Sequence, residues 1–394
     1  MNPRLDNIFF KTAWPFMLLT FLSGCAAALF VPTMSLFLSK EVNVSPFAVG
    51  MFFTCNALCG IVVSQLLARR SDRQGGRKQL ICRCMLAGSL ACVLFACSRS
   101  YGVLISVGIL LMSIGATASP QIFALAREYS DVKGRSGVMF TSWMRAMFSL
   151  AWVVGPPIAF AITLHYGFAV LFLSGLAIYL LCALVAYLGL PELASAASAR
   201  GPQTSQANGR AVRWLFVAST LFWTCNNMYL IAMPLYVTTQ LAQPEGLAGW
   251  MMGTAAGLEI PIMLTAGWAC ARLRKHSLLM ISGVAAVLFY VTMLSQTTPV
   301  MLLLAQLGNA LFIGILAGLG MLYFQDLLPG RAGVATTLFT NSIRSGAILA
   351  GGLAGVVAEY FDYHAVFLVA LVMSVLALGC LWIVGRVDGS GVAH

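Results

Sequence analysis

The sequence predicts an all-α, polytopic membrane protein with twelve transmembrane helices in two six-helix bundles. Three observations predict this fold. Apolar side chains make up 60% of the 394 residues and charged side chains only 9%, long apolar runs recur along the whole chain, and the charged residues gather between those runs. This composition excludes a soluble domain, and the length excludes a single membrane anchor.

Each predicted span has the length that a helix rising about 1.5 Å per residue needs to cross the hydrocarbon core. In chain order the spans are 13–38, 46–68, 79–97, 101–126, 137–164, 168–190, 214–237, 247–270, 277–295, 300–325, 332–358 and 365–385. The first span is much longer than the apolar part of a signal peptide, so we expect it to be retained. Most of the 11 cysteines lie inside spans without metal-ligand spacing, which indicates packing residues.

The positions of the basic residues predict the orientation in the membrane. Of the 23 Lys and Arg residues, only Lys40 and Arg99 fall in loops on one side, two more lie inside spans, and the others fall on the opposite side. Basic loops remain in the cytoplasm, so both termini are expected there. The same clusters account for the net charge of +11, and we therefore expect no nucleic-acid partner.

A hydrophilic segment near the middle of the chain predicts the domain organisation. Residues 191–213 are rich in Ala, Ser, Gly and Gln, and they are expected to form a cytoplasmic linker between a bundle at 1–190 and a bundle at 214–394. Similar residues recur in the two bundles 199 positions apart, and this offset aligns Arg145 with Arg344. Paired six-helix halves are typical of transporters that bind substrate near the middle of the membrane.

Three ionisable residues lie deep inside predicted spans, namely Arg145, Glu259 and Arg344. Each is about 12–18 Å from the cytoplasmic end of its span at helical rise. A charge near the bilayer centre costs about 2.5–3.5 kcal/mol on insertion scales, so such a side chain is expected to face the protein interior or a watery cavity.

The span that contains Arg145 has features of a helix that lines a cavity. Thr141, Ser149 and Trp152 share a helical face with Arg145, so this face is polar. The prolines of Gly155-Pro156-Pro157 remove backbone hydrogen-bond donors and are expected to loosen the helix. A polar face and a bend together predict a cavity-lining helix that moves.

The segment between the second and third spans carries a family signature. Residues 68–78 read ARRSDRQGGRK, which resembles the G-x-x-x-D-R-x-G-R-R/K pattern of the major facilitator superfamily. Alanine replaces the first glycine and one extra glycine precedes the basic pair. The matching residues are Asp72, Arg73, Gly75, Arg77 and Lys78. The resemblance implies the major facilitator fold, with this loop latching helix ends on the cytoplasmic face.

Three further strings narrow the resemblance. Gly155 and Pro156 resemble the glycine-proline signature of exporters in this superfamily. FALAREY at 123–129, MRAMFSLAWVVGPPIAF at 144–160 and PTMSLFLSKEV at 32–42 resemble the bacterial sugar efflux transporters, a proton-linked branch. This resemblance, and not the composition, implies sugars or small glycosides as cargo and an outward direction of transport.

The resemblance also implies that the spans with Arg145 and Glu259 adjoin between the two bundles. An isolated carboxylate in a site of low dielectric constant favours its protonated form, whereas a nearby guanidinium favours the ionised form. Making and breaking this contact would therefore switch proton binding at Glu259, with Arg344 in a gating or substrate role. A static tie between helices is the alternative interpretation of the same residues.

Sugars are recognised by amides that hydrogen-bond to hydroxyl groups and by aromatic rings that stack on the sugar ring. Buried amides are expensive without a partner, but a bond between helices satisfies an amide as well as a sugar does. The candidate substrate-binding residues are Asn56, Gln121, Trp152, Asn226, Asn227, Gln306, Asn309 and Asn341.

The sequence therefore predicts a monomeric proton-coupled antiporter that exports sugars across the bacterial inner membrane. An exporter of drugs or other small molecules shares the same signatures, and a membrane sensor that transports nothing is a third interpretation. No phosphate-binding glycine loop, nucleophile-base pair or metal-ligand cluster is present in the sequence. We accordingly expect no enzyme activity, no cofactor and no metal; protons, sugar and the lipid bilayer are the expected partners.

Overall fold

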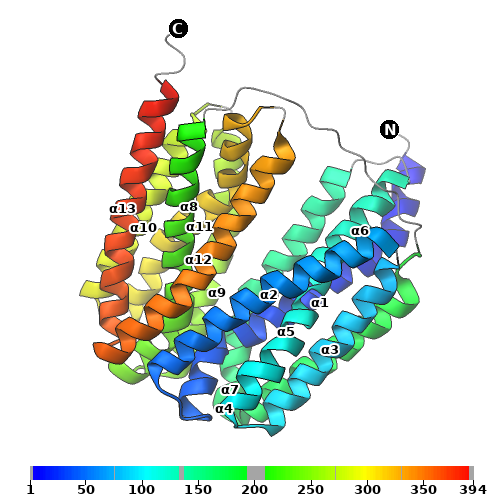
Figure 1. The fold of residues 1–394 in the computed structure, drawn as a ribbon, viewed down its shortest axis with the longest axis horizontal. Coiled ribbons are helices and arrows are strands. Elements are labelled where there is room, and N and C mark those ends of the chain that lie inside the picture. The colour runs from blue at the N-terminus through cyan, green and yellow to red at the C-terminus, as the bar shows by residue number, and fades with distance from the viewer. Residues whose placement is uncertain are drawn as a thin grey trace. The chain divides into compact units, whose positions relative to one another are not determined.

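The computed structural model describes residues 3–74, 76–132, 137–192, 209–270, 272–329 and 331–389, and within these ranges it contains helices without any strand (Figure 1). The contacts divide the chain into two compact units. Unit 1 comprises Met1–Phe37 and Leu58–Ala199, and unit 2 comprises Leu38–Ala57 and Arg200–His394. Residues 193–208 of the expected linker lie outside the described residues.

The first eight elements begin at the N-terminus and end before the expected linker. They are α1 (Pro3–Lys40), α2 (Pro46–Gln74), α3 (Arg77–Cys97), α4 (Tyr101–Val103), η1 (Leu104–Gly108), α5 (Ile109–Ala116), α6 (Ala118–Val132) and α7 (Gly137–Gly189). The span predicted at 101–126 is thus an almost continuous helical path from α4 to α6 with a π-helical turn, η1, inside it.

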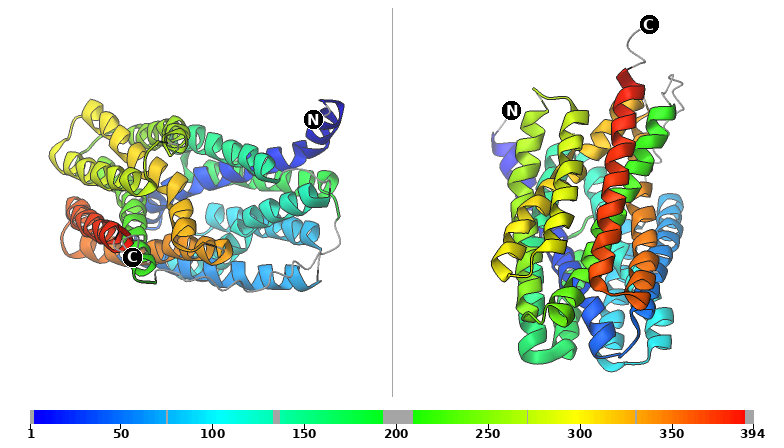
Figure 2. Two further views of the ribbon diagram at one scale, coloured as in Figure 1. Left: turned by 90° about the horizontal axis from the view of Figure 1, so that it is seen from above. Right: turned by 90° about the vertical axis from the view of Figure 1, so that its left-hand side faces the viewer.

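The remaining elements belong to unit 2. They are α8 (Gly209–Leu235), η2 (Tyr236–Gln240), α9 (Glu245–Ala269), α10 (Lys275–Ser295), α11 (Pro299–Leu327), α12 (Ala332–Tyr360) and α13 (Tyr363–Gly389). Within this unit α8 packs against α12 and α13, while α11 packs between α9 and α10. Figure 2 shows α10 and α11 running side by side in two further views.

Among the described residues, ten helical stretches are long and apolar enough to cross a membrane. One of them, Trp143–Gly189, has 47 residues, which is about 70 Å of helix and enough for two crossings. Its backbone leaves the helical region at Gly167, where φ is 82° and ψ is 172°. Counting both parts of this stretch and adding the 29-residue α12, which contains Arg344, gives the twelve predicted spans.

The break expected at the prolines of α7 lies at a different residue in the structure. Pro156 and Pro157 lie inside continuous helix, and the non-helical residue is Gly167, at the junction of the fifth and sixth predicted spans. Gly167 suits this junction because a positive φ carries no steric penalty for glycine. Gly155 is needed for packing, since a Cβ on it would overlap the Cβ of Ala28 in α1.

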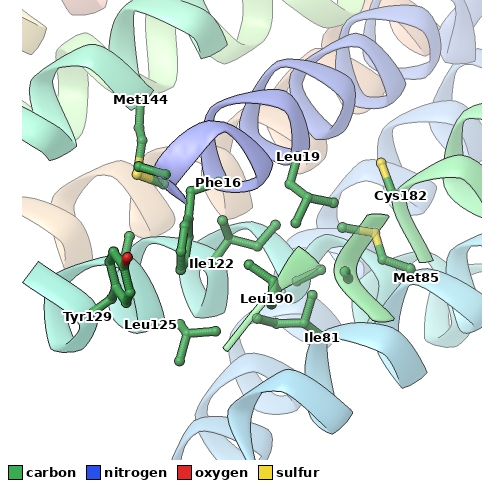
Figure 3. Close-up of a cluster of buried hydrophobic side chains, with 14 of the residues drawn as sticks. Phe16, Leu19, Ile81, Met85, Ile122, Leu125, Tyr129, Met144, Cys182 and Leu190 are labelled. Carbon is green, nitrogen blue, oxygen red and sulfur yellow. The ribbon is translucent and has the colours of Figure 1, made fainter. Parts of the chain in front are cut away.

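The core of unit 1 is an apolar cluster that joins α1 to α3, α6 and α7. Phe16 is fully buried, and its ring centroid lies 5.5 Å from that of Tyr129 and 5.7 Å from that of Phe140. Figure 3 shows Phe16 among Ile122, Leu125, Tyr129 and Met144. These side chains come from helices that are distant in sequence, so burial of this cluster fixes the bundle.

In unit 2 a glycine contact joins α2 to α12. A Cβ on Gly50 would overlap the backbone of Gly351 and Gly355, so the two helices approach at backbone distance. The Thr54 hydroxyl donates to the carbonyl of Ile348 at 3.1 Å. The backbone N–H of Phe47 donates to the Glu359 carboxylate at 3.0 Å, in the first turn of α2.

Candidate functional site

Glu259 lies on the inward face of α9. At about 100° per residue, it shares this face with the buried side chains of Ala248, Met252 and Ala255. The most exposed apolar side chains of α9, Leu264 and Trp268 among them, lie about 140–180° away around the helix. The carboxylate therefore points away from the apolar outer face of α9, as expected for a charge that must avoid lipid.

Next to α9, three polar side chains form a hydrogen-bonded group inside unit 2. The Tyr229 hydroxyl of α8 donates to the Gln306 side-chain oxygen of α11 at 3.0 Å, and the Asn309 amide donates to the same oxygen at 3.2 Å. All three residues are buried. The group joins α8 to α11, and α11 packs against α9, the helix of Glu259.

Asn226 and Asn227 lie half-buried in α8, one helical turn before Tyr229. The Asn227 amide donates to the carbonyl of Trp223 in its own helix at 2.7 Å. The structure therefore satisfies Asn227 locally, and the Asn226 side chain is the one of this pair with no hydrogen bond to another described residue. Both remain predicted substrate residues.

Arg145 lies in the first part of α7 with an exposed side chain. The exposed apolar residues of this part, including Leu150 and Val154, lie about 140–180° around the helix from it. Half-buried Ser149 and Trp152 lie on its own side, and the Trp152 ring N–H is buried without a partner among the described residues. A polar face separate from the apolar outer face is thus present in α7, as predicted.

Arg344 lies half-buried on α12. By helical spacing it shares a face with Gly351 and Gly355, which pack against α2, while Gly346 on the opposite side packs against Trp223. Asn341 of α12 is exposed and Asn56 of α2 is half-buried, and both belong to unit 2. Arg145 belongs to unit 1 and Glu259 to unit 2. Their pairing therefore stays a prediction.

Gln121 is held by charged neighbours in unit 1. Arg77, at the start of α3, donates to the Gln121 side-chain oxygen at 2.8 Å and to the Glu128 carboxylate at 2.9 Å. Gln121 and Glu128 are seven positions apart and so lie on one face of α6. Arg77 therefore ties the start of α3 to two turns of α6, and sugar binding by Gln121 stays a prediction.

The structure describes some of the remaining residues of the loop signature and of the glycine-proline signature. Asp72 and Arg73 lie at the end of α2, but their side chains, together with all of Gly75, fall outside the described residues. Lys78 lies over the Tyr187 ring, 5.8 Å from its centroid. Gly155 and Pro156 are both buried in α7.

Two features of the structure were not predicted from the sequence, the contact of Glu128 with Arg77 and the burial of the Tyr290 hydroxyl. Glu128 was not expected to hold Arg77, although its spacing of seven from Gln121 was a signal for a shared face. Tyr290 of α10 is fully buried and its hydroxyl lacks a partner among the described residues. No sequence pattern marked it, because an aromatic residue in an apolar span is typical of ordinary packing.

The chain is similar to one family model over nearly its whole length. The model described as Major Facilitator Superfamily matches residues 16–241 and again residues 215–392. The two matches overlap at residues 215–241 and together extend over residues 16–392.

Curated relatives extend along almost the same length. "Sugar efflux transporter A" of Dickeya chrysanthemi is 53% identical over 373 residues, covering 94% of this chain and 95% of the relative. "Sugar efflux transporter B" of Salmonella typhimurium is 52% identical, with coverage of 94% and 95%. "Sugar efflux transporter C" of Escherichia coli is 46% identical, also with coverage of 94% and 95%.

Solved structures share the fold at much lower identity. The crystal structure of nucleoside transporter NupG has a TM-score of 0.80 and 16% identity, and the match covers 95% of this chain and 99% of that one. A bacterial homologue of the human lysosomal transporter Spinster has a TM-score of 0.75 and 12% identity, with coverage of 98% for both chains.

Proposed function

Because this chain belongs to the sugar efflux transporters of the major facilitator superfamily, we propose that it exports sugars or small glycosides across the bacterial inner membrane in exchange for protons. Its relatives are named transporters, and the chain is accordingly a transporter and not an enzyme. The observation that carries the proposal is identity of 46–53% over 94% of the chain to proteins named for sugar efflux.

Glu259 is the proposed proton carrier. It is an acidic residue in the interior of α9, on the face opposite the apolar outer stripe, and no ion pair joins it to another described residue. A carboxylate in such a site changes its proton occupancy when a positive charge or a polar group approaches or leaves. Alternating access supplies that change, because the carboxylate faces each side of the membrane in turn.

Arg145 is the proposed partner of Glu259 in one state of the transport cycle, and Arg344 the proposed gating residue. Arg145 presents its guanidinium on the polar face of α7, away from the apolar stripe. Arg344 occupies the face of α12 that packs against α2 through Gly351 and Gly355. A shift of α2 relative to α12 would change the surroundings of Arg344, which suits a gate.

The sugar itself is proposed to bind to side chains that still have free hydrogen-bonding capacity. Asn56, Asn226 and Asn341 are half-buried or exposed, and Trp152 presents a ring for stacking. Gln121, Gln306 and Asn309 already bond to neighbouring side chains. The side-chain oxygens of Gln121 and Gln306 would contact sugar only if those bonds opened, whereas the Asn309 side-chain oxygen has no partner among the described residues.

We place both termini in the cytoplasm and treat the chain as a monomer in the inner membrane. The basic residues of the loops support the orientation. In this orientation the α2–α12 glycine contact lies in the outer half of the membrane, since Gly50 is close to the external end of its span.

Inside-out vesicles test the function directly. Vesicles that contain the protein are given radiolabelled lactose, glucose or a thiogalactoside, with an acid lumen or with equal pH on both sides. We expect accumulation of label only with the acid lumen, and its collapse with an uncoupler. Transport of a cationic dye without any sugar accumulation would instead identify a drug exporter, and transport of neither would leave the sensor interpretation.

Two matched variants of one helix test the carrier. Glu259→Gln is expected to abolish accumulation driven by the pH gradient while preserving exchange of sugar for sugar, because the amide cannot carry a proton. Glu245→Gln, at the start of α9 where Glu245 pairs with Lys40, is expected to retain driven accumulation. Driven accumulation by the Glu259→Gln variant would show that another residue carries the proton.

A further inference from the structure

Two exposed tryptophans of unit 2 each lie beneath an arginine. The guanidinium carbon of Arg272 lies 4.6 Å from the centroid of the Trp268 ring, and that of Arg386 lies 3.7 Å from the centroid of the Trp382 ring. Trp268 is 64% exposed and Trp382 is 49% exposed. In both pairs the arginine follows the tryptophan by four positions, which is about one helical turn. The same arrangement therefore occurs near the ends of two helices, α9 and α13.

Both pairs lie at the end of unit 2 where α10 begins. Arg272 lies in the loop between α9 and α10, four positions before His276. A Cβ on Gly385 of α13 would overlap the His276 ring, and a hydrogen bond of 3.4 Å joins His276 to Tyr323 of α11. Arg386 directly follows Gly385, and Figure 1 shows α13 beside α10. The two guanidiniums therefore belong to one surface around the first turn of α10.

Exposed apolar side chains continue from each tryptophan along its helix. On α13, Val375 lies about 20° around the helix from Trp382 and is 50% exposed. On α9, Leu264 lies about 40° around the helix from Trp268 and is 72% exposed. Exposed apolar faces of a membrane-spanning helix contact acyl chains, and the tryptophans and arginines at its ends lie at the level of the lipid headgroups. The surface thus offers apolar side chains to acyl chains and guanidiniums to headgroups.

The positive charge of these two arginines is not neutralised within the part of the chain that the structure describes. Neither Arg272 nor Arg386 has an ion pair with another described residue. The carboxylate of Asp326, at the same end of unit 2, pairs with Lys275 at 2.7 Å. The side chain of Asp388, in the last turn of α13, lies outside the described residues. An excess of positive charge at a surface favours binding of an anion from outside the chain.

A guanidinium that lies on an aromatic ring is suited to binding phosphate. The ring covers one face of the guanidinium, whereas the N–H groups lie in its plane and point outward from the edge. A phosphate group accepts two of these N–H bonds in parallel. Because the ring already holds the guanidinium, less side-chain freedom is lost when the phosphate binds. Arg272 and Arg386 both have this arrangement.

We propose that Arg272 and Arg386 bind the phosphates of anionic phospholipids, whose acyl chains lie along the exposed faces of α9 and α13. A zwitterionic phospholipid also has a phosphate, but its amine is repelled by the positive charge of this surface. In the proposed orientation the surface lies in the cytoplasmic leaflet, where basic residues attract anionic lipids. The binding does not depend on the cargo or on proton coupling, so its failure would leave the proposed transport function unaffected.

Native mass spectrometry of the detergent-purified protein, with phosphatidylglycerol, phosphatidylcholine or inorganic phosphate added, tests the proposal. We expect the unmodified chain to retain phosphatidylglycerol in preference to phosphatidylcholine and to retain no inorganic phosphate. Arg272→Gln/Arg386→Gln should lower this preference by about fivefold for each arginine. The matched control is Arg210→Gln/Arg213→Gln, which removes two exposed arginines at the start of α8 that lie over no described ring. We expect the control to keep the preference.

Arg272→Lys/Arg386→Lys completes the test, because it keeps the charge and removes the planar guanidinium. We expect part of the preference to be lost, and this conservative variant carries the test if the glutamine variant does not fold. An unchanged preference in the lysine variant would show that charge alone suffices and would overturn the role of the ring-held guanidiniums. Equal losses in the two glutamine variants would indicate general surface charge and would also overturn the proposal. Retention of inorganic phosphate, or of a second copy of the chain in place of lipid, would identify a different occupant and overturn it as well.

Discussion

The interiors of the two units differ in the hydrogen bonds of their buried polar groups. In unit 1 the described bonds of buried hydroxyls stay within one helix, as Thr20 donates to Phe16 at 2.7 Å and Thr163 to Ala159 at 2.8 Å. In unit 2 buried polar groups also join different helices, as Ser282 of α10 donates to the carbonyl of Phe312 in α11 at 2.7 Å and Tyr229 donates to Gln306.

The helices of unit 1 are therefore joined mainly by apolar packing, whereas those of unit 2 are also joined by hydrogen bonds that could change partner. Unit 1 joins its helices through an apolar cluster, and its described polar link between helices, the contact of Arg77 with Gln121 and Glu128, is at the start of α3. An apolar side chain in such a cluster has no hydrogen-bond partner that it could exchange for another. A hydrogen bond between helices can be exchanged for another, so the interior of unit 2 is the better place for a residue whose charge changes during transport.

The largest loss of unfolding free energy is expected for a substitution in the apolar interior of unit 1. Phe16→Ala removes a fully buried ring from the centre of the cluster and leaves a cavity, which costs about 3–5 kcal/mol of unfolding free energy. Thermal unfolding in detergent, followed by tryptophan fluorescence, measures the loss. A loss below that of the polar variants described next would contradict apolar packing as the main link between the helices of unit 1.

The next effect is expected at the Arg77 contact. Glu128→Ala removes a charged acceptor from a half-buried guanidinium and leaves its bond to Gln121 in place. Hydrogen bonds to charged groups contribute about 1.5–3 kcal/mol, so the loss should lie in that range. The same unfolding measurement applies, with Glu192→Ala as a control at an exposed position beyond the end of α7. Equal stability of both variants would show that the Arg77 contact contributes nothing.

The smallest losses of unfolding free energy are expected for single hydroxyl groups. They compare a hydrogen bond between two helices with one inside a single helix. Ser282→Ala removes a donor to another helix and should cost about 0.5–1.5 kcal/mol. Thr20→Val removes a donor to its own helix, where the Phe16 carbonyl also accepts a backbone bond, and should cost less. If Thr20→Val is the more damaging of the two, the contrast between the units is wrong.

The number of membrane spans followed from the sequence because the length of an apolar run decides how often it can cross a bilayer. The span predicted at 46–68 is α2, Pro46–Gln74, whose end is longer because a helix continues past the hydrocarbon core. The spans predicted at 137–164 and 168–190 are the two parts of α7, and Gly167 lies at their junction. The π-helical turns η1 and η2 were not predicted, since no spacing of apolar residues marks them.

The contacts of the candidate site residues could not be predicted from the sequence. Which face of a helix each amide occupies depends on rotation about the helix axis, and an apolar span hardly constrains that rotation. Gln306 and Asn309 therefore looked equivalent to Asn341, yet the first two are buried in a bonded group and Asn341 is exposed. The partners of Gln121 were likewise hidden, because Arg77 is 44 positions away in the chain.

The most direct test of sugar-proton exchange uses the purified protein in liposomes that contain a pH-sensitive dye, with equal pH on both sides. Sugar is added outside, and both its entry and the lumen pH are recorded. We predict that the lumen becomes more alkaline as sugar enters, because protons leave in exchange, and that the Glu259→Gln variant exchanges sugar without any change in pH. Entry of sugar through the unmodified protein at constant lumen pH would contradict the account.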